Sequence, residues 1–257
     1  MTRTVYQPVP LCRFLLSFLT LAALLVPTVS AAAWRVIPIR LDFDQRTKSG
    51  VITLSNDGET SITFAIEAVE WSQDKQGQDQ YTATQDLVFF PKLLTIEPNA
   101  ERVVRAGIRV PATAHEKTYR LFIKEAAEPK KAEGTTVAIA IKFGVPIFAK
   151  PFKEEIKGEI LRPLVAGDQI GLTIANTGNG HFRIGTVRLA GVNAAGEAIF
   201  SKEVSGWYLL SGSAKEFSIP IDPGVCAQLK TIDIKMNADR LYLEKKIDVS
   251  PAMCVEQ

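Results

Sequence analysis

The feature that most constrains the fold of this chain is an alternation of apolar and polar residues with a period of two, which recurs along most of the sequence after residue 33. Val104, Ala106 and Ile108, for example, alternate with more polar neighbours. Because successive side chains of a β-strand point to opposite faces, this alternation is typical of strands with one buried face. Residues favoured in turns, mainly Gly, Asn, Asp and Pro, separate the segments. The sequence therefore predicts an all-β protein.

The alternating segments fall into two groups, which are separated by a charged, proline-containing stretch at 150–155. About seven short strands in one group match an immunoglobulin-like β-sandwich, although the Cys-Trp-Cys arrangement of antibody domains is absent from the first group. We therefore predict an N-terminal immunoglobulin-like domain at 34–151 and a C-terminal immunoglobulin-like β-sandwich at 152–257. The expected strands are 35–43, 50–55, 61–71, 80–89, 93–97, 102–110, 119–124 and 137–148, followed by 159–164, 169–175, 181–190, 198–203, 216–221, 230–236 and 241–249.

Residues 1–33 have the order of a cleavable secretory signal. Arg3 and Arg13 precede an apolar run at 14–26, and small residues follow at 30–33. The run is shorter than the roughly 20 apolar residues that a membrane-spanning helix needs. We expect the signal to be removed on export and the mature chain to be a soluble protein outside the cytoplasm.

Export would leave Cys226 and Cys254 as the thiols of the mature chain, because Cys12 lies in the signal. An oxidising compartment favours one disulfide between them. Removal of Arg3 and Arg13 would bring the formal net charge from +2 to about zero. Nucleic-acid-binding domains are usually strongly basic, so we expect no nucleic-acid partner.

No residue pattern typical of an active site appears in the sequence. Its two histidines, His115 and His181, lie in or beside polar loops without metal-ligand spacing, and we expect both on the surface. Phosphate-binding loops and nucleophile elbows are also absent. We therefore predict a protein that is not an enzyme and that uses no metal, nucleotide or other cofactor. A competing hypothesis, a secreted hydrolase, would require an activity that depends on His115 or His181.

The segment at 135–151 is the strongest indication of function. Val137, Ile139 and Ile141 fall on one side of a strand with small alanines between them, and a charged, loop-like stretch at 125–134 precedes them. One interpretation is an ordinary interior strand of the sandwich. The other is an apolar row at a sheet edge, to which an incomplete sheet of another protein, or a second copy of this chain, adds.

Four segments carry a family resemblance. The first is a strand with an arginine, followed by a strand that ends in Asn. The second is a Pro-containing segment with a Glu-Pro turn, followed by an arginine-bearing strand. The third and fourth are the strands before and after the charged loop. They read Arg40-Leu-Asp-Phe-Asp-Gln-Arg-Thr-Lys-Ser-Gly-Val-Ile-Thr-Leu-Ser-Asn56, then Phe90-Pro-Lys-Leu-Leu-Thr-Ile-Glu-Pro-Asn99 with Arg102-Val-Val-Arg105, then Tyr119-Arg-Leu-Phe-Ile-Lys-Glu125, and then 137–151. In order and spacing these segments resemble the PapD-like periplasmic chaperones of the chaperone–usher pathway, over most of 35–151. Residues 152–250 are similar only in general character.

The resemblance implies a periplasmic protein with two immunoglobulin-like domains in a boomerang arrangement. It implies that Val137, Ile139 and Ile141 match the hydrophobic residues that these chaperones insert into a pilus or fimbrial subunit lacking its last strand, which is donor-strand complementation. It also implies delivery of the subunit to an outer-membrane usher. By similarity, Arg40 would bind the terminal carboxylate of the subunit, a task that suits the permanently charged guanidinium fork.

The chain departs from the family at one position of the carboxylate anchor. Well-known members pair the arginine with a lysine on the donor strand, and alignment on Lys150 puts Pro146 at that position. This departure is similar to divergent branches of the family. Lys142, on the same side of an unbroken strand, and Arg105, on the arginine-bearing strand, are the other candidates for the anchor.

The resemblance further implies an ion-pair network between the domains, with Glu125 and Lys150 as members and Asp239 as a third. Such exposed pairs would set the angle between the domains more than they would add stability. A rival hypothesis keeps the same architecture without subunit capture, as a two-domain immunoglobulin-like envelope protein with a binding or structural role.

Overall fold

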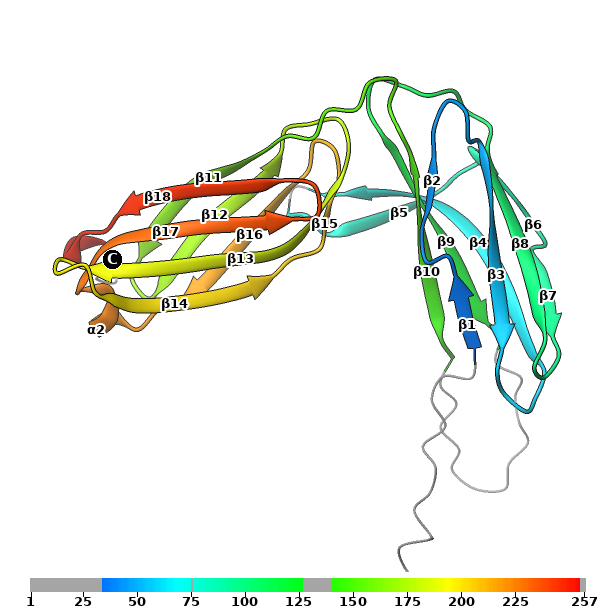
Figure 1. Cartoon of the computed structure of the whole chain (residues 1–257), viewed down its shortest axis with the longest axis horizontal. Coiled ribbons are helices and arrows are strands. Elements are labelled where there is room, and N and C mark those ends of the chain that lie inside the picture. The colour runs from blue at the N-terminus through cyan, green and yellow to red at the C-terminus, as the bar shows by residue number, and fades with distance from the viewer. Residues whose placement is uncertain (1–33, 75, 127–139, 255–257) are drawn as a thin grey trace, which may run out of the picture. The chain divides into compact units, whose positions relative to one another are not determined.

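The computed structural model describes residues 34–74, 76–126 and 140–254, and nearly all of their regular structure is β-strand (Figure 1). The strands form two β-sandwiches, one built from residues before position 150 and one from residues after position 157. The all-β prediction with two immunoglobulin-like sandwiches is therefore confirmed. Our domain bounds at 34–151 and 152–257 and the signal at 1–33 stay predictions. No helix in the described ranges has the length and apolar character to cross a membrane.

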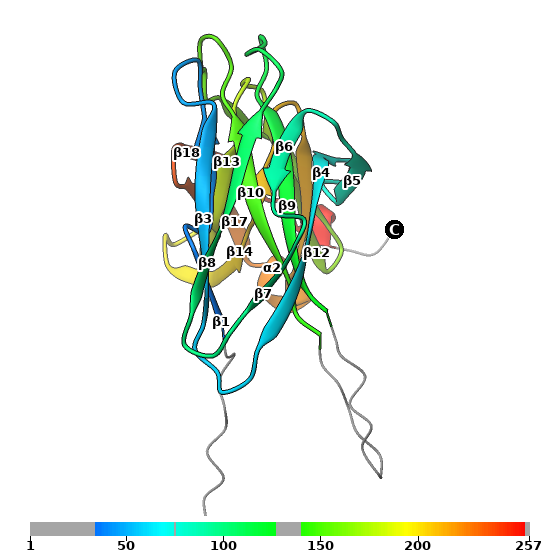
Figure 2. The ribbon, with the colours of Figure 1, turned by 90° about the vertical axis from the view of Figure 1, so that its right-hand side faces the viewer.

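The N-terminal sandwich consists of two sheets that enclose a core of aliphatic and aromatic side chains, among them Ile52, Phe64, Val104, Leu121 and Ile147. One sheet has the order β1-β3-β8-β6, and the other has the order β2-β10-β9-β4-β5 with β7 paired to β4 (Figure 2). The strands are β1 (Trp34–Ile37), β2 (Leu41–Phe43), β3 (Ser49–Asn56), β4 (Ile62–Gln73), β5 (Asp79–Ala83), β6 (Leu87–Phe90), β7 (Leu93–Ile96), β8 (Glu101–Ile108), β9 (Lys117–Glu125) and β10 (Lys142–Ala149).

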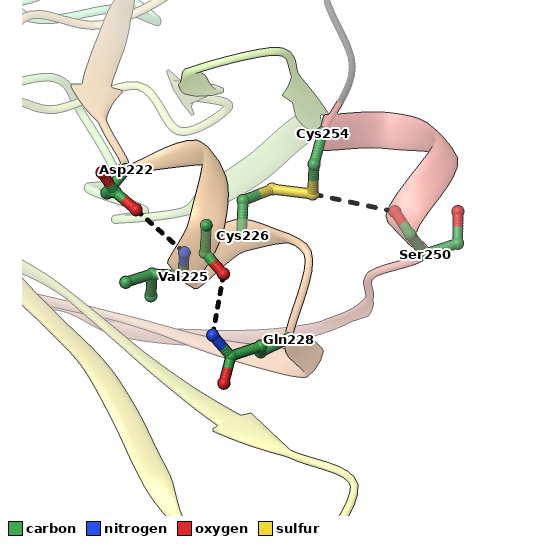
Figure 3. Close-up of a disulfide and its surroundings, with 7 residues drawn as sticks. Asp222, Val225, Cys226, Gln228, Ser250 and Cys254 are labelled. Atoms are coloured by element: carbon green, nitrogen blue, oxygen red, sulfur yellow. Dashed lines mark hydrogen bonds between the residues drawn. A yellow bond between two sulfur atoms is a disulfide. The ribbon is translucent and has the colours of Figure 1, made fainter.

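The C-terminal sandwich has a three-stranded sheet in the order β11-β12-β16 and a second sheet in the order β14-β13-β17-β18, with β15 paired to β13. Two short helices, α2 and η2, hold the disulfide between Cys226 and Cys254 (Figure 3). The elements are β11 (Gly158–Ala166), β12 (Gln169–Asn176), β13 (Phe182–Asn193), β14 (Ala198–Ser205), β15 (Tyr208–Leu209), β16 (Ala214–Pro220), α2 (Pro223–Cys226), β17 (Leu229–Ala238), β18 (Tyr242–Asp248) and η2 (Pro251–Cys254).

Two of the predicted strands are wrong in extent because the chain changes sheets within them. The expected strand at 35–43 is two strands, since β1 pairs with β3 in one sheet and β2 pairs with β10 in the other. Pro38, which has no backbone N–H, lies at the break. An unbroken alternating strand at 35–43 would bury Ile37 and Ile39 together with Leu41 and Phe43, but Ile37 and Ile39 are 58% and 66% exposed. The expected strand at 80–89 is likewise divided between β5 and β6, which belong to different sheets.

The two sandwiches repeat one buried asparagine arrangement. Asn56 ends β3, its Oδ1 accepts a hydrogen bond from the backbone N–H two residues later, and its Nδ2 donates to the carbonyl four residues later and to Ile96 O. Asn176 ends β12 and makes the same set, with Leu209 O in place of Ile96 O. Both side chains are buried. The equivalence indicates that the two sandwiches are built on one structural plan.

Candidate functional site

Strand β10 has an open edge over part of its length. On one side it pairs with β9 from Lys142 to Ala149, whereas on the other side it pairs with β2 only from Ile147 to Ala149 (Figure 1). Between Lys142 and Pro146, β10 therefore has no second neighbour among the described strands. Backbone groups along such an edge are free to pair with a strand from another chain.

The ladder between β9 and β10 indicates which groups face the open edge. Glu125 N donates to Ile141 O at 3.0 Å, so this pair exchanges hydrogen bonds within the hairpin. Because antiparallel pairs alternate, the N–H and C=O groups of Lys142 and Gly144 point away from β9, toward the open edge. Pro146, which has no N–H to offer, occupies the next position that faces this edge.

The apolar residues that we predicted to be donated come before this strand in the sequence. Ile141 directly precedes β10 and is 37% exposed. Val137 and Ile139 lie outside the described residues. The segment that carries all three therefore leads directly into the open edge of β10.

Arg40 lies beside the end of the open edge. It immediately precedes β2, and its Nε donates to Asp42 Oδ2 at 2.8 Å. Its Cζ is 5.9 Å from the ring centroid of Phe148 on β10. The side chain is 43% exposed, so it is available to an anion that arrives from solvent.

Lys142 and Arg105 lie apart from Arg40. Lys142 stands at the opposite end of β10 from Phe148, about 20 Å along the strand at 3.3 Å per residue, and its Nζ is 3.6 Å from the ring centroid of Phe122. Arg105 belongs to β8 in the other sheet of the sandwich. The structure therefore does not bring together the three cations that we considered for one carboxylate.

Glu125, Lys150 and Asp239 are also not brought together. Glu125 ends β9, whereas Lys150 follows β10 at the other end of the same hairpin. Asp239 Oδ1 accepts a hydrogen bond from Arg183 N at 2.8 Å within the C-terminal sandwich.

A different ion pair joins the linker to the C-terminal sandwich. Arg240 of the C-terminal sandwich pairs with Glu154, which follows β10. Burial, the largest single effect, raises the pKa of Glu154, but the hydrogen bond and charge of Arg240, together with other nearby cations such as Lys150, outweigh it, so the pKa of this carboxyl is lowered. Arg240 also donates to His181 O at 3.3 Å. Sequence reasoning missed this pair because its members are 86 residues apart.

His181 is buried, so our expectation of a surface position is wrong. Its Nδ1 lies 2.8 Å from Glu116 Oε2, and its backbone N–H donates to the same oxygen. The ring stacks on Phe148 with 3.5 Å between centroids. The polar turn before His181 indicated exposure, and nothing local in the sequence indicates the distant Phe148 and Glu116. His115 is exposed, with Nδ1 3.2 Å from Ser211 Oγ.

An aromatic cluster covers the outer face of the sheet next to Arg40. Trp71 on β4 lies 6.0 Å from Phe148 and 5.6 Å from Tyr208 of the C-terminal sandwich, measured between ring centroids. The sequence did not indicate this cluster, because its members come from three separate strands. In the described ranges, no group of three or more His, Cys, Asp or Glu side chains is placed to hold a metal ion.

The two immunoglobulin-like sandwiches, one with an open strand edge beside a cation, define a two-domain all-β class of protein. Residues 34–154 match a family described as the pili and flagellar-assembly chaperone, PapD N-terminal domain. Residues 34–154 therefore belong to the N-terminal domain family of the PapD-like pilus-assembly chaperones, a non-enzymatic class, and the two-domain fold of the chain is similar to that of solved chaperones.

Three solved structures illustrate the likeness of fold. A chain of the CsuC–CsuE chaperone–tip adhesion subunit pre-assembly complex of Acinetobacter baumannii is 18% identical with a TM-score of 0.57, over 84% of this chain and 98% of that chain. A chain of the chaperone–tip adhesin complex of CFA/I fimbriae biogenesis is 15% identical with a TM-score of 0.54, over 85% and 100%. A chain of the SafA pilin–SafB chaperone complex of Salmonella enterica is 14% identical with a TM-score of 0.53, over 86% and 99%. No curated protein sequence matches this chain.

Proposed function

We propose that this chain is a periplasmic chaperone that captures pilus or fimbrial subunits by donor-strand complementation and delivers them to an outer-membrane usher. The observation that carries the proposal is the open edge of β10 from Lys142 to Pro146, directly after the apolar residues Val137, Ile139 and Ile141. Residues 1–33 would direct export and then be removed. The proposed activity needs no catalytic residue, nucleotide or other cofactor.

Donor-strand complementation would remove two sources of instability in an incomplete subunit. A sandwich that lacks a strand exposes an apolar groove and unpaired backbone groups, and both promote aggregation. The edge of β10 would complete the hydrogen-bond ladder of the subunit. Burial of three aliphatic side chains contributes about 1.5–3 kcal/mol each, before the cost of ordering is subtracted.

The extent of β2 supports a role for Arg40 at the end of the added strand. Because β2 covers β10 from Ile147 onward, a subunit strand along the open edge would have to stop near Pro146. A strand that runs parallel to β10 would end there with its carboxylate, beside the guanidinium of Arg40. Asp42 would hold that guanidinium until the carboxylate replaces it.

Co-export with a pilin-like subunit tests the proposal. The wild-type chain should raise the amount of soluble subunit and form a one-to-one complex, and Ile139→Asp should abolish both effects. Ala138→Asp is the matched control, because it places the same charge on the opposite side of the strand and should retain capture. If the wild-type chain neither raises soluble subunit nor forms a complex, the rival of an envelope protein without subunit capture is favoured.

A further inference from the structure

Arg40 and Arg120 flank Pro146 in one row across three neighbouring strands. The parallel register pairs Leu41 with Ile147, so one further step places Arg40 beside Pro146. On the other side, Pro146 is the direct partner of Arg120 on β9. Neighbouring strands are about 4.8 Å apart, so the Cα atoms of the two arginines are about 10 Å apart.

The two arginines lie on the same face of the sheet. Leu41, Leu121 and Ile147 are buried in the sandwich core, and each is adjacent in sequence to one member of the row. Because side chains alternate between faces, Arg40, Pro146 and Arg120 all lie on the outer face. The proline leaves only a small ring between the two cations.

Arg120 reaches from β9 toward the open edge. Its Nη1 donates to Gly144 O at 3.1 Å, and the ladder turns this carbonyl away from β9. Gly144 leaves room for the ring of Phe122 beside it, because an added Cβ at this position would lie 2.9 Å from a ring carbon of that residue. The guanidinium carbon is 3.8 Å from the ring centroid of Trp71, which stacks beneath the charge.

The charge of Arg120 is buried, and no carboxylate in the described part of the chain lies within ion-pair distance of it. The residue is only 7% exposed, and its Nε has no hydrogen-bond partner. Burial lowers the pKa of its guanidinium, and Asp79 and Tyr81 offset this effect only in part. A buried cation is costly unless an anion compensates it. The unpartnered Nε and the absence of a carboxylate at ion-pair distance leave room for an anion from outside the chain.

We infer that Arg120 supplies the second positive charge of the carboxylate site, in place of a lysine at Pro146. The inference rests on the proposed capture of a subunit strand and assigns the partner of Arg40. A strand that ends over Pro146 places its terminal carboxylate between the two guanidinium groups. Lys142 and Arg105 cannot serve this carboxylate, because one lies at the far end of β10 and the other lies on the other sheet.

The test uses a defined carboxylate rather than a subunit. The exported, purified chain is titrated with N-acetyl-alanyl-valine that has a free carboxylate, and with the same dipeptide as its amide, while the Nε–H resonance of Arg120 is followed by NMR. The free acid should shift this resonance saturably and the amide should not. This measurement on the wild-type chain does not depend on the folding of any variant.

Variants then separate charge from packing. Arg120→Met keeps the length of the side chain on Trp71 but removes the charge, and should weaken binding of the free acid about 10-fold or more, whereas Arg120→Lys should remain within about 3-fold. Arg105→Met is the matched control, because it removes the same charge from the other sheet and should have no effect.

Two results would overturn the inference: binding of the acid that depends on Arg40 but not on Arg120, or no difference between the acid and the amide. Either result leaves capture by the strand edge intact, since co-export measures that separately. Loss of capture in co-export with normal binding of the acid would instead count against the proposed function.

Discussion

The imidazole of His181 stacks on the phenyl ring of Phe148, with 3.5 Å between the ring centroids and 13° between the ring planes. Phe148 belongs to the strand with the open edge, and His181 precedes the first residue of β13 in the other sandwich. The same imidazole lies 2.8 Å from the buried carboxylate of Glu116. One histidine thus joins the proposed donor strand to the C-terminal sandwich.

Replacement of His181 by alanine should destabilise the chain. The change removes the stacked ring and leaves the buried Glu116 carboxylate without its side-chain partner, so we expect the free energy of unfolding to fall by about 2–4 kcal/mol. Urea unfolding of the purified chain measures this loss. His115→Ala is the matched control, because His115 is exposed and should change stability by less than about 0.5 kcal/mol. Equal effects of the two variants would contradict the role of His181.

The two buried asparagines should be equally important for their own sandwiches. Asn56→Ala and Asn176→Ala each leave buried backbone groups without hydrogen-bond partners, and each should cost about 2–3 kcal/mol. Asn237→Ala, at an exposed strand position, should cost less than about 0.5 kcal/mol. Thermal unfolding compares the three variants. A small effect at one buried site and a large effect at the other would show that the two sandwiches do not share this arrangement.

Loss of the disulfide should weaken the C-terminal sandwich. Cys226 and Cys254 are separated by 28 residues, and a loop of that length corresponds to about 3.6 kcal/mol of stabilisation in the chain-entropy account. The double replacement of both cysteines by alanine should therefore lower the urea midpoint of the C-terminal sandwich and leave that of the N-terminal sandwich unchanged. If the reduced and oxidised wild-type chains unfold at the same urea concentration, the disulfide has no stabilising role.

The stability of the N-terminal sandwich should depend on pH through Asp86. A hydrogen bond from Lys117, assisted by one from Tyr119, lowers the pKa of this carboxyl in the folded chain. The ionised Asp86 carboxylate therefore stabilises the folded chain fully above the pKa of an unfolded aspartate, about 4. This contribution is lost as the pH falls through the lower pKa of Asp86 in the folded chain. Asp86→Asn should flatten the fall of unfolding free energy below about pH 4. Tyr119→Phe removes one of the two hydrogen-bond donors, so its unfolding free energy should fall with a slope between those of the wild-type chain and Asp86→Asn. If Asp86→Asn has the same slope as the wild-type chain, Asp86 is not the source of the pH dependence.

The alternation of residues was sufficient to predict most strands, because burial on one face requires a period of two. It failed at Pro38, where the chain passes from one sheet to the other although the apolar pattern continues through Ile39. The disulfide partners could be predicted from composition, because the chain after residue 33 has two cysteines.

The site was less predictable, because its parts come from distant segments. Arg40 was proposed from the flanking motif, whereas the role that we infer for Arg120 depends on its register with Pro146, which the sequence does not reveal. His181 was misplaced for the same reason, since its partners Phe148 and Glu116 are remote in sequence. Local patterns predict which face a residue occupies, but they do not predict which residue lies opposite on the next strand.

Amide hydrogen exchange at Gly144 tests the central claim most directly. In the free chain the ladder turns this N–H toward the open edge of β10, whereas that of Val145 is directed to β9. If a subunit strand adds to this edge, exchange at Gly144 should slow by about 100-fold or more in a purified one-to-one complex with a pilin-like subunit, while exchange at Val145 changes little. Unchanged exchange at Gly144 in such a complex would show that the subunit binds elsewhere and would contradict capture through this edge.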